Sequence, residues 1–270
     1  MKRSLLFCNV LFAIIALSAQ DSLKIAIDSA VEANMRQQVV SDDIFMQATE
    51  AYSKSDFLTS ATIYEQILKE KGASATVYYN LGNSYYKAGK IAPSILNYER
   101  ALLLNPGDSD TRHNLEIARL KTVDKIEPVG EFFISSWLWA VRDIFSTDEW
   151  TVFAIVCFIL LVICLFLFCF TRRIILKKLG FYAGIGFFVL VIAANFFAAG
   201  EKNQLTQRNT AIVVSQTVTI KSSPDTSGTD LFILHEGTKV KIKNKLNDWN
   251  EIETADGNVG WIFSEEIEVI

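Results

Sequence analysis

The sequence predicts a multidomain chain made of an α-helical repeat array, a two-helix transmembrane hairpin and a C-terminal all-β barrel. Three observations predict it: a repeat with a period of 34 residues within 41–121, two uncharged apolar runs at 150–170 and 179–199, and a series of short β-type runs over 209–270. Half of the 270 residues are apolar and the mean hydropathy is +0.25. Such an excess is usually concentrated in a few long runs, which is the case here.

The first 19 residues have the pattern of an export signal. Lys2 and Arg3 precede an apolar stretch at 5–17, and small residues follow it. The stretch is too short for a membrane core of about 30 Å. We therefore expect a signal peptide over 1–19, cut after Ala19, with an uncleaved anchor as the alternative. Cys8 lies too early in the chain to be a lipid attachment site.

The two apolar runs are each long enough to cross a bilayer as a helix. The segment between them, 171–178, carries four basic residues and no acid, whereas the outer flanks are acidic. Basic short loops stay in the cytoplasm. The sequence therefore predicts an integral protein of a bacterial inner membrane with two spans, a cytoplasmic loop at 171–178, and both soluble domains in the periplasm. Small residues on the second span, among them Gly180 and Gly184, indicate packing between the two spans or contact with another protein.

A short aromatic segment at 131–145 precedes the first span. Its apolar residues recur at helical spacing, and Trp137 and Trp139 suit the headgroup level of a membrane. We interpret it as an interfacial helix. A buried third helix of the repeat domain is the alternative.

The chain lacks the residue clusters that catalysis would need. Beyond Cys8, its cysteines are Cys157, Cys164 and Cys169, all within the first span, and its only histidines are His113 and His235, in different domains. No metal-ligand cluster, nucleophile elbow or phosphate loop is present. The sequence predicts no enzyme, no cofactor and no metal. The net charge of −4 gives no reason to expect a nucleic-acid partner.

The repeat is seen when the sequence is shifted by 34 residues. Small residues then coincide with small ones and aromatic residues with aromatic ones, as Ala48 with Gly82 and Tyr64 with Tyr98. This period is typical of stacked helix-turn-helix units. Neither unit can bury its apolar faces alone, so the units must stack.

The segment Tyr78-Tyr79-Asn80-Leu81-Gly82-Asn83-Ser84-Tyr85-Tyr86-Lys87-Ala88-Gly89, followed by Ser94, Tyr98, Ala101 and Pro106, resembles a tetratricopeptide (TPR) repeat. The unit at 41–74 matches less well, and a third copy begins at 111–121 and resembles the solvating helix that ends such arrays. The resemblance implies partner binding on a concave face formed by the first helix of each unit. The residues expected on it are Thr49, Asn83, Tyr86, Lys87, His113 and Asn114.

Two features of that face have alternative interpretations. Asn83 and Asn114 are similar to part of an asparagine pair that holds a terminal carboxylate in some relatives, but they also fit generic consensus positions. Of the basic residues that complete that clamp, only Lys87 and Lys121 are candidates. The tyrosines at 52, 79 and 86 are either contacts or core between units.

Short β-type runs separated by turn clusters over 209–270 predict a small barrel. The segments Lys221-Ser222-Ser223-Pro224 and Asp256-Gly257-Asn258-Val259-Gly260-Trp261-Ile262, together with Trp249, resemble the bacterial SH3 (SH3b) family. Relatives bind cell-wall peptides or protein segments in aromatic-lined grooves. Trp249 and Trp261 either line such a groove or fill the barrel.

The order signal, TPR repeats, span, basic loop, span, SH3b resembles the BatE family of the Bacteroides aerotolerance operon. The resemblance covers essentially the whole chain but rests on domain order. It implies a membrane-anchored scaffold linked to stress or oxygen tolerance. Its implied partners are von Willebrand factor A-type Bat proteins, together with a MoxR-type ATPase acting from the cytoplasm. The alternative is a protein that senses or anchors the cell wall by reading peptidoglycan peptides.

Overall fold

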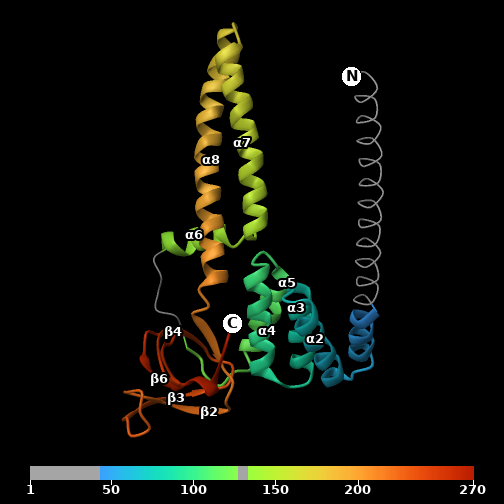
Figure 1. Cartoon of the computed structure of the whole chain (residues 1–270), viewed down its shortest axis with the longest axis vertical. Coiled ribbons are helices and arrows are strands. Elements are labelled where there is room, and N and C mark those ends of the chain that lie inside the picture. Colours follow the sequence, from blue (N-terminus) through green and yellow to red (C-terminus); the bar gives the residue numbers. More distant parts are fainter. Residues whose placement is uncertain (1–42, 127–132) are drawn as a thin grey trace, which may run out of the picture. The chain divides into compact units, whose positions relative to one another are not determined.

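The structure is a computed structural model that describes residues 43–126 and 133–270 (Figure 1). The expected signal peptide at 1–19 lies outside the described residues. The chain divides into two units, Met1–Ile67 and Leu68–Ile270, and each is described by itself. The predicted fold class is confirmed: helical repeats, two long apolar helices and a C-terminal antiparallel sheet follow one another.

The first unit contains a helix at 43–53 and most of α2 (Phe57–Lys71). Tyr64 on α2 is 2% exposed, and its ring lies edge-on to Phe45 at 5.5 Å between centroids. Its hydroxyl is 3.1 Å from Thr49 Oγ1. Ala48 is fully buried, so a small residue lets the two helices approach.

The second unit begins with α3 (Ala75–Lys87), α4 (Ile91–Leu104) and α5 (Ser109–Arg119). Gly82 on α3 lies directly against Tyr98 on α4, and a Cβ atom at position 82 would be 2.7 Å from the tyrosine ring. Ser94 Oγ donates a 2.9 Å hydrogen bond to the carbonyl oxygen of Gly82. Asp108 caps α5 by accepting hydrogen bonds from the backbone N–H groups of Asp110 and Thr111.

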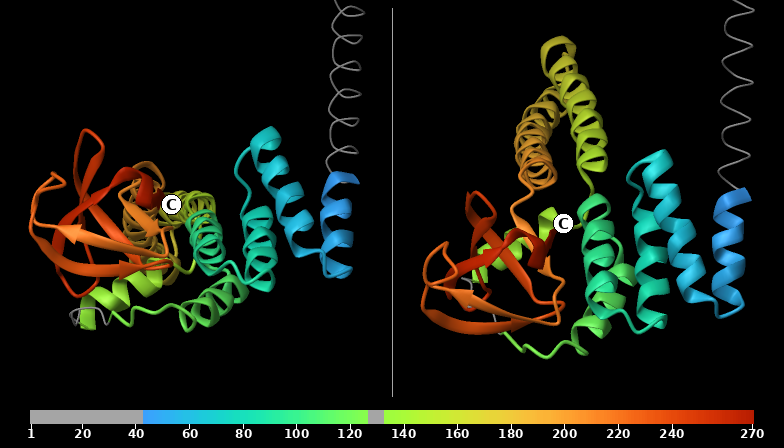
Figure 2. Two further views of the ribbon diagram at one scale, coloured as in Figure 1. Left: turned by 90° about the horizontal axis from the view of Figure 1, so that it is seen from below. Right: turned by 60° about the horizontal axis from the view of Figure 1, so that its bottom comes forward.

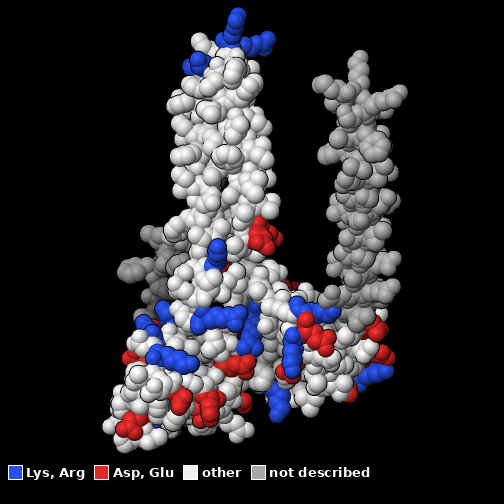
Figure 3. Space-filling view, in the orientation of Figure 1, with Lys and Arg blue, Asp and Glu red and all other residues white. Residues whose placement is uncertain are grey.

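The hairpin follows as α6 (Phe133–Arg142), α7 (Thr147–Phe170) and α8 (Ile174–Thr206). α7 and α8 are long and apolar enough to cross a membrane, and most of their large apolar side chains face outward. Figure 3 shows an uncharged middle and basic side chains at the tip. Residues 174–178, expected in the loop, instead form the first turns of α8, where Lys177 N donates to Arg173 O.

The two long helices pack closely at α8 glycines. A Cβ atom at Gly180 would lie 2.8 Å from the carbonyl oxygen of Cys164, and one at Gly184 would lie 3.6 Å from Cys164 Cβ. A Cβ atom at Gly186 would meet no atom within 4 Å. Two of the small residues on this helix therefore serve contact between α7 and α8.

Polar contacts fix the base of the hairpin. Arg142 at the end of α6 forms an ion pair with Glu201 on α8 at 2.7 Å, and its carbonyl oxygen accepts a hydrogen bond from Trp150 Nε1 at 2.9 Å. Ser146 and Glu149 form a capping box at the start of α7. α6 is thereby tied to both long helices.

Seven antiparallel strands form the C-terminal sheet of the described chain, in the order β3-β2-β6-β5-β4-β1-β7. They are β1 (Thr210–Val213), β2 (Thr217–Lys221), β3 (Asp230–His235), β4 (Lys239–Leu246), β5 (Trp249–Glu253), β6 (Val259–Phe263) and β7 (Ile267–Val269), with a 3-10 turn, η1 (Ser264–Glu266), before β7. Fully buried Ile220, Ile252 and Ile262 lie at the centre of the core. A Cβ atom at Gly260 would be only 2.3 Å from Ile220 Cγ2, so the core requires glycine there.

The barrel and the α4–α5 pair share a second core. Ile212 on β1 and Ile270 after β7 are buried in one cluster with Ile95 on α4 and Leu115 and Ala118 on α5. Figure 2 shows α4 and the barrel side by side in both views. The helices and the barrel of the second unit are therefore one packed body, although the hairpin separates them in sequence.

Candidate partner-binding surfaces

Asn83 and Asn114 lie side by side in the structure, and their side chains are hydrogen-bonded to each other. Asn83 Oδ1 accepts hydrogen bonds from Tyr98 Oη at 2.6 Å and from Asn114 Nδ2 at 3.0 Å. Asn114 Nδ2 also lies 3.2 Å from Tyr79 Oη. The pair thus joins α3, α4 and α5. Much of its hydrogen-bonding capacity is used inside the domain.

The other residues predicted for this face differ in exposure. Lys87 at the end of α3 and His113 on α5 are exposed. Tyr86 is half-buried, and Lys121 Nζ lies 4.5 Å from the centre of its ring. Thr49 belongs to the first unit, where its hydroxyl contacts Phe45 O and Tyr64 Oη. Lys87 and His113 are therefore the side chains best placed to meet a partner.

Trp249 and Trp261 lie on the outer face of the barrel sheet. Trp249 pairs with Phe263 and Trp261 pairs with Glu251 across β5 and β6, and cross-strand partners point to the same side. Neither tryptophan belongs to the cluster that fills the barrel. Trp249 is nevertheless buried, with 9% of its surface exposed, and its ring centroid lies 3.9 Å from that of Phe263.

A junction between α4 and the barrel was not predicted from the sequence. Its centre is Glu99, which is 7% exposed and binds Lys239 of β4 at 2.8 Å and also Arg119 of α5. Burial alone would raise the pKa of Glu99, but the two cations hold it below its usual value. No sequence signal could have revealed this contact, since Glu99 and Lys239 lie 140 positions apart.

Asp124 forms a second polar contact of the junction. Its carboxylate accepts hydrogen bonds from the backbone N–H of His235 and from Thr238 Oγ1, both at 2.7 Å. His235 Nδ1 lies 2.8 Å from the other carboxylate oxygen. Partial burial would raise the pKa of Asp124, and these hydrogen bonds lower it below its usual value.

The junction also requires a glycine. Gly237 has a φ of +87°, and a Cβ atom there would be 2.8 Å from the Thr122 side chain and 3.1 Å from Ile95 Cδ1. Arg100 on α4 donates hydrogen bonds to Glu268 at 2.9 Å and to the carbonyl oxygen of Val269 at 2.7 Å. Four separate contacts thus hold the barrel against α4 and the segment after α5.

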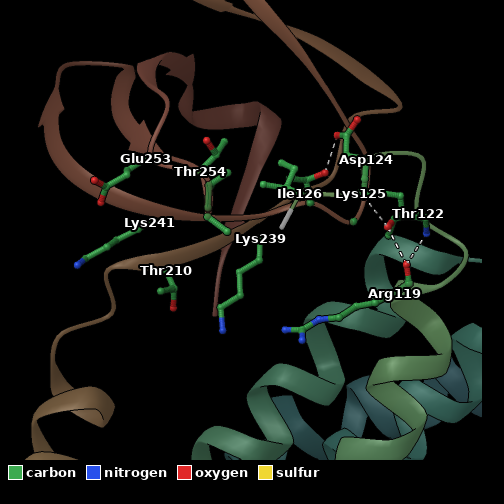
Figure 4. A pocket seen from close by; sticks show the side chains of 15 residues that line it. Arg119, Thr122, Asp124, Lys125, Ile126, Thr210, Lys239, Lys241, Glu253 and Thr254 are labelled. Carbon is green, nitrogen blue, oxygen red and sulfur yellow. Dashed lines mark hydrogen bonds between the residues drawn. The ribbon is translucent and has the colours of Figure 1, made fainter. Parts of the chain in front are cut away.

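A cleft of about 840 Å³ opens beside this junction. Its walls come from the segment 119–126 on one side, and from β1, β4 and the turn at 253–257 on the other (Figure 4). In Figure 4, Arg119 and Lys239 reach toward each other across it, and Lys241 follows further along β4. Within the described ranges, no group of three or more His, Cys, Asp or Glu side chains is placed to hold a metal ion.

Comparison with known families matches two segments of the chain. Residues 75–108, which span α3, α4 and the following turn, match the tetratricopeptide repeat model. Residues 216–268, from β2 to β7, match the bacterial SH3 domain model. Both are typically binding domains, so the chain carries two modules of a binding type. No curated protein matches the chain.

Proposed function

We propose that this protein is a non-catalytic scaffold anchored in a bacterial inner membrane, with its TPR–SH3b body in the periplasm. The observation that carries the proposal is that a protein-interaction repeat and an SH3 barrel pack into one body. They do so although a hairpin long enough to span a bilayer separates them in sequence. Two domains that touch must lie on the same side of a membrane. The basic residues at the tip of the hairpin favour a cytoplasmic position for the tip. The TPR–SH3b body, at the other end of the uncharged length, then lies outside the cytoplasm.

The resemblance to the BatE family supports the finer part of the proposal. On that basis the scaffold assembles von Willebrand factor A-type Bat proteins, in a process linked to stress or oxygen tolerance. The contact surface is the face of α3 and α5 that carries Lys87 and His113, with Asn83, Tyr86 and Asn114 beside them. This face is separate from the α4 side that the barrel covers.

The test is partner co-purification from native membranes with Lys87→Glu and His113→Glu combined. This pair spares Asn83, whose removal would unpair Tyr98 and Asn114. We expect binding to weaken by about 2–4 kcal/mol, the range of a lost hot spot. The matched control is Lys69→Glu with Lys90→Glu, two exposed cations outside the face, which should keep the partner. Equal retention by both variants would remove this face from the proposal.

A second function, recognition of peptidoglycan peptides, is favoured by one observation: Trp249, Trp261 and Phe263 share the outer face of the barrel. The test is binding of soluble stem peptides to the full chain. Binding that is lost in Trp261→Ala and unaffected by the Lys87 and His113 changes would favour wall recognition over the scaffold function.

A further inference from the structure

The cleft between the helices and the barrel carries more positive charge than its surroundings. From residue 209 to the end the chain has 5 Lys and 10 Asp or Glu, so the barrel as a whole is acidic. Four of those lysines lie on β4, at 239, 241, 243 and 245. The basic character of this strand is therefore a local feature and does not follow from composition.

Two of the cations in the cleft share a single buried partner. Arg119 and Lys239 both bind Glu99, yet their side chains remain 46% and 40% exposed. One carboxylate cannot neutralise two cations. An arginine also has five N–H donors in a fixed fork, more than this one contact uses. Both side chains can therefore bind a further carboxylate that enters the cleft.

Lys241 extends the row of positive charge. It is exposed, and among the described residues its side chain forms no ion pair or hydrogen bond. Its cross-strand neighbour Glu253 is bound by Lys243 at 2.8 Å, a hydrogen bond that lowers the pKa of that carboxyl, and the charge of Lys241 lowers this pKa further. The remaining acid of the cleft, Asp124, is held by His235 and Thr238. Both acids that line the cleft thus have a closer partner than Lys241.

The spacing of the cations fits an extended ligand. Side chains two residues apart on a strand lie on the same side at about 6.5–7 Å. Lys239 and Lys241 have this spacing on β4, and the carboxylates of an extended peptide with acidic residues at i and i+2 have it too. A cleft of about 840 Å³ is large enough for a short segment of this kind.

We propose that the cleft between α5 and β4 binds an extended acidic segment of a partner protein, with carboxylates held by Arg119 and Lys239 at one end and by Lys241 at the other. The inference rests on the proposed scaffold function and adds a second contact, distinct from the face of Lys87 and His113. A partner held in the same membrane can use two weak contacts together, because the first raises the effective concentration for the second.

The test uses the full chain in phosphatidylcholine nanodiscs and a fluorescein-labelled hexapeptide of alternating Glu and Val, with binding followed by fluorescence anisotropy. We expect saturable binding that weakens in about 0.5 M salt, and none for the alternating Lys and Val peptide. Lys241→Glu should raise the Kd about tenfold or more. Ala255→Glu, at an exposed position on the cleft wall, should also raise it.

Lys245→Glu is the matched control, since it makes the same charge change on the same strand but outside the cleft. It should change the Kd less than about twofold. Absence of peptide binding, or an equal effect of Lys241→Glu and Lys245→Glu, would overturn the inference. Tighter binding of soluble wall stem peptides with the same dependence on Lys241 would also overturn it, in favour of a wall ligand. Loss of partner co-purification only in the Lys87 and His113 variant would leave the scaffold function standing without this second contact.

Discussion

At the scale of residues, Glu99, which is buried, and Asp124, which is partly buried, show how carboxylates can join domains that are distant in sequence. Each is an acid on the helical side that is satisfied by groups on the barrel. A buried charge is tolerated only when it is paired and hydrogen-bonded. These two residues therefore make the junction specific: a barrel placed elsewhere on the helices would leave both carboxylates without those partners.

The lowered pKa values of Glu99 and Asp124 predict a junction that weakens in acid. A group whose pKa is lower in the folded state contributes stability above its unfolded pKa and loses it as pH falls through the folded value. For these carboxylates the loss begins below about pH 4. Glu99→Gln should reduce the free energy of unfolding at pH 7 by about 1–3 kcal/mol.

Urea unfolding of the full chain in mild detergent, followed by tryptophan fluorescence from pH 7 to about pH 3, measures this effect. The difference between wild type and Glu99→Gln should shrink toward acid pH. Glu116→Gln, a change at an exposed glutamate on α5, serves as the control and should lie close to wild type throughout. A difference that stays constant with pH would contradict the assignment.

At the scale of elements, close approach at glycine decides how helices and strands pack. Three glycines leave space for a neighbouring side chain because they have no Cβ atom. The neighbours are Tyr98 at Gly82, Ile220 at Gly260 and Thr122 at Gly237. In each case a side-chain carbon would occupy space already filled. Close approach at a glycine thus sets the packing within the helical pair, the packing within the barrel, and the contact between the two.

Gly82→Leu should destabilise the helical pair by about 1–3 kcal/mol or more, because extra atoms would be forced into a packed contact. The control is Thr76→Leu, which introduces the same side chain at an exposed position of the same helix. Thermal unfolding of the full chain by circular dichroism measures both. Equal melting temperatures for the two variants would show that Gly82 does not face Tyr98.

Gly237→Ala tests the junction itself. The change adds the strain of a positive φ and also the clash with Thr122. Gly89→Ala is a matched control, since Gly89 has a φ of +76° and a Cβ atom there would meet no atom within 4 Å. We expect Gly237→Ala to be less stable than Gly89→Ala by about 1–2 kcal/mol in urea unfolding. Similar losses would mean that the barrel does not press on the helices at this point.

At the scale of the whole molecule, contacts at the base of the hairpin join it to the packed body of helices and barrel. α6 is bound to α8 through Arg142 and Glu201, and α8 leads within four residues to β1, which carries Ile212 into the core shared with α4. Both ends of the hairpin therefore join the same packed body. Ile270 is also buried in that core, next to Ile212 and the residues of α4 and α5.

The proposed topology predicts which positions a membrane-impermeant maleimide can label in intact cells with a permeabilised outer membrane. In a background with the native cysteines replaced by alanine, Ser227→Cys, at an exposed turn of the barrel, should react at once. Lys177→Cys, near the tip of the hairpin, should react only after the inner membrane is opened. Immediate labelling at position 177 together with protection at 227 would reverse the topology.

The elements and their order can be predicted from the sequence, because each has a local signal. The 34-residue period predicts the paired helices, the uncharged apolar runs predict α7 and α8, and the alternation at 239–243 predicts a half-buried strand. The sequence also placed Asn83 and Asn114 on one face of the repeat, where the structure finds them 3.0 Å apart.

How the helices and the barrel of the second unit meet could not be predicted from the sequence, because it depends on long-range contacts. The contacts of Glu99 with Lys239, and of Asp124 with His235, join residues more than a hundred positions apart, and no periodicity links them. The tertiary structure also placed Trp249 and Trp261 on the opposite face of the sheet from Ile252 and Ile262, because strand register and not residue type sets which face a side chain takes. The cleft exists for the same reason: its two walls belong to domains that the sequence separates by a membrane hairpin.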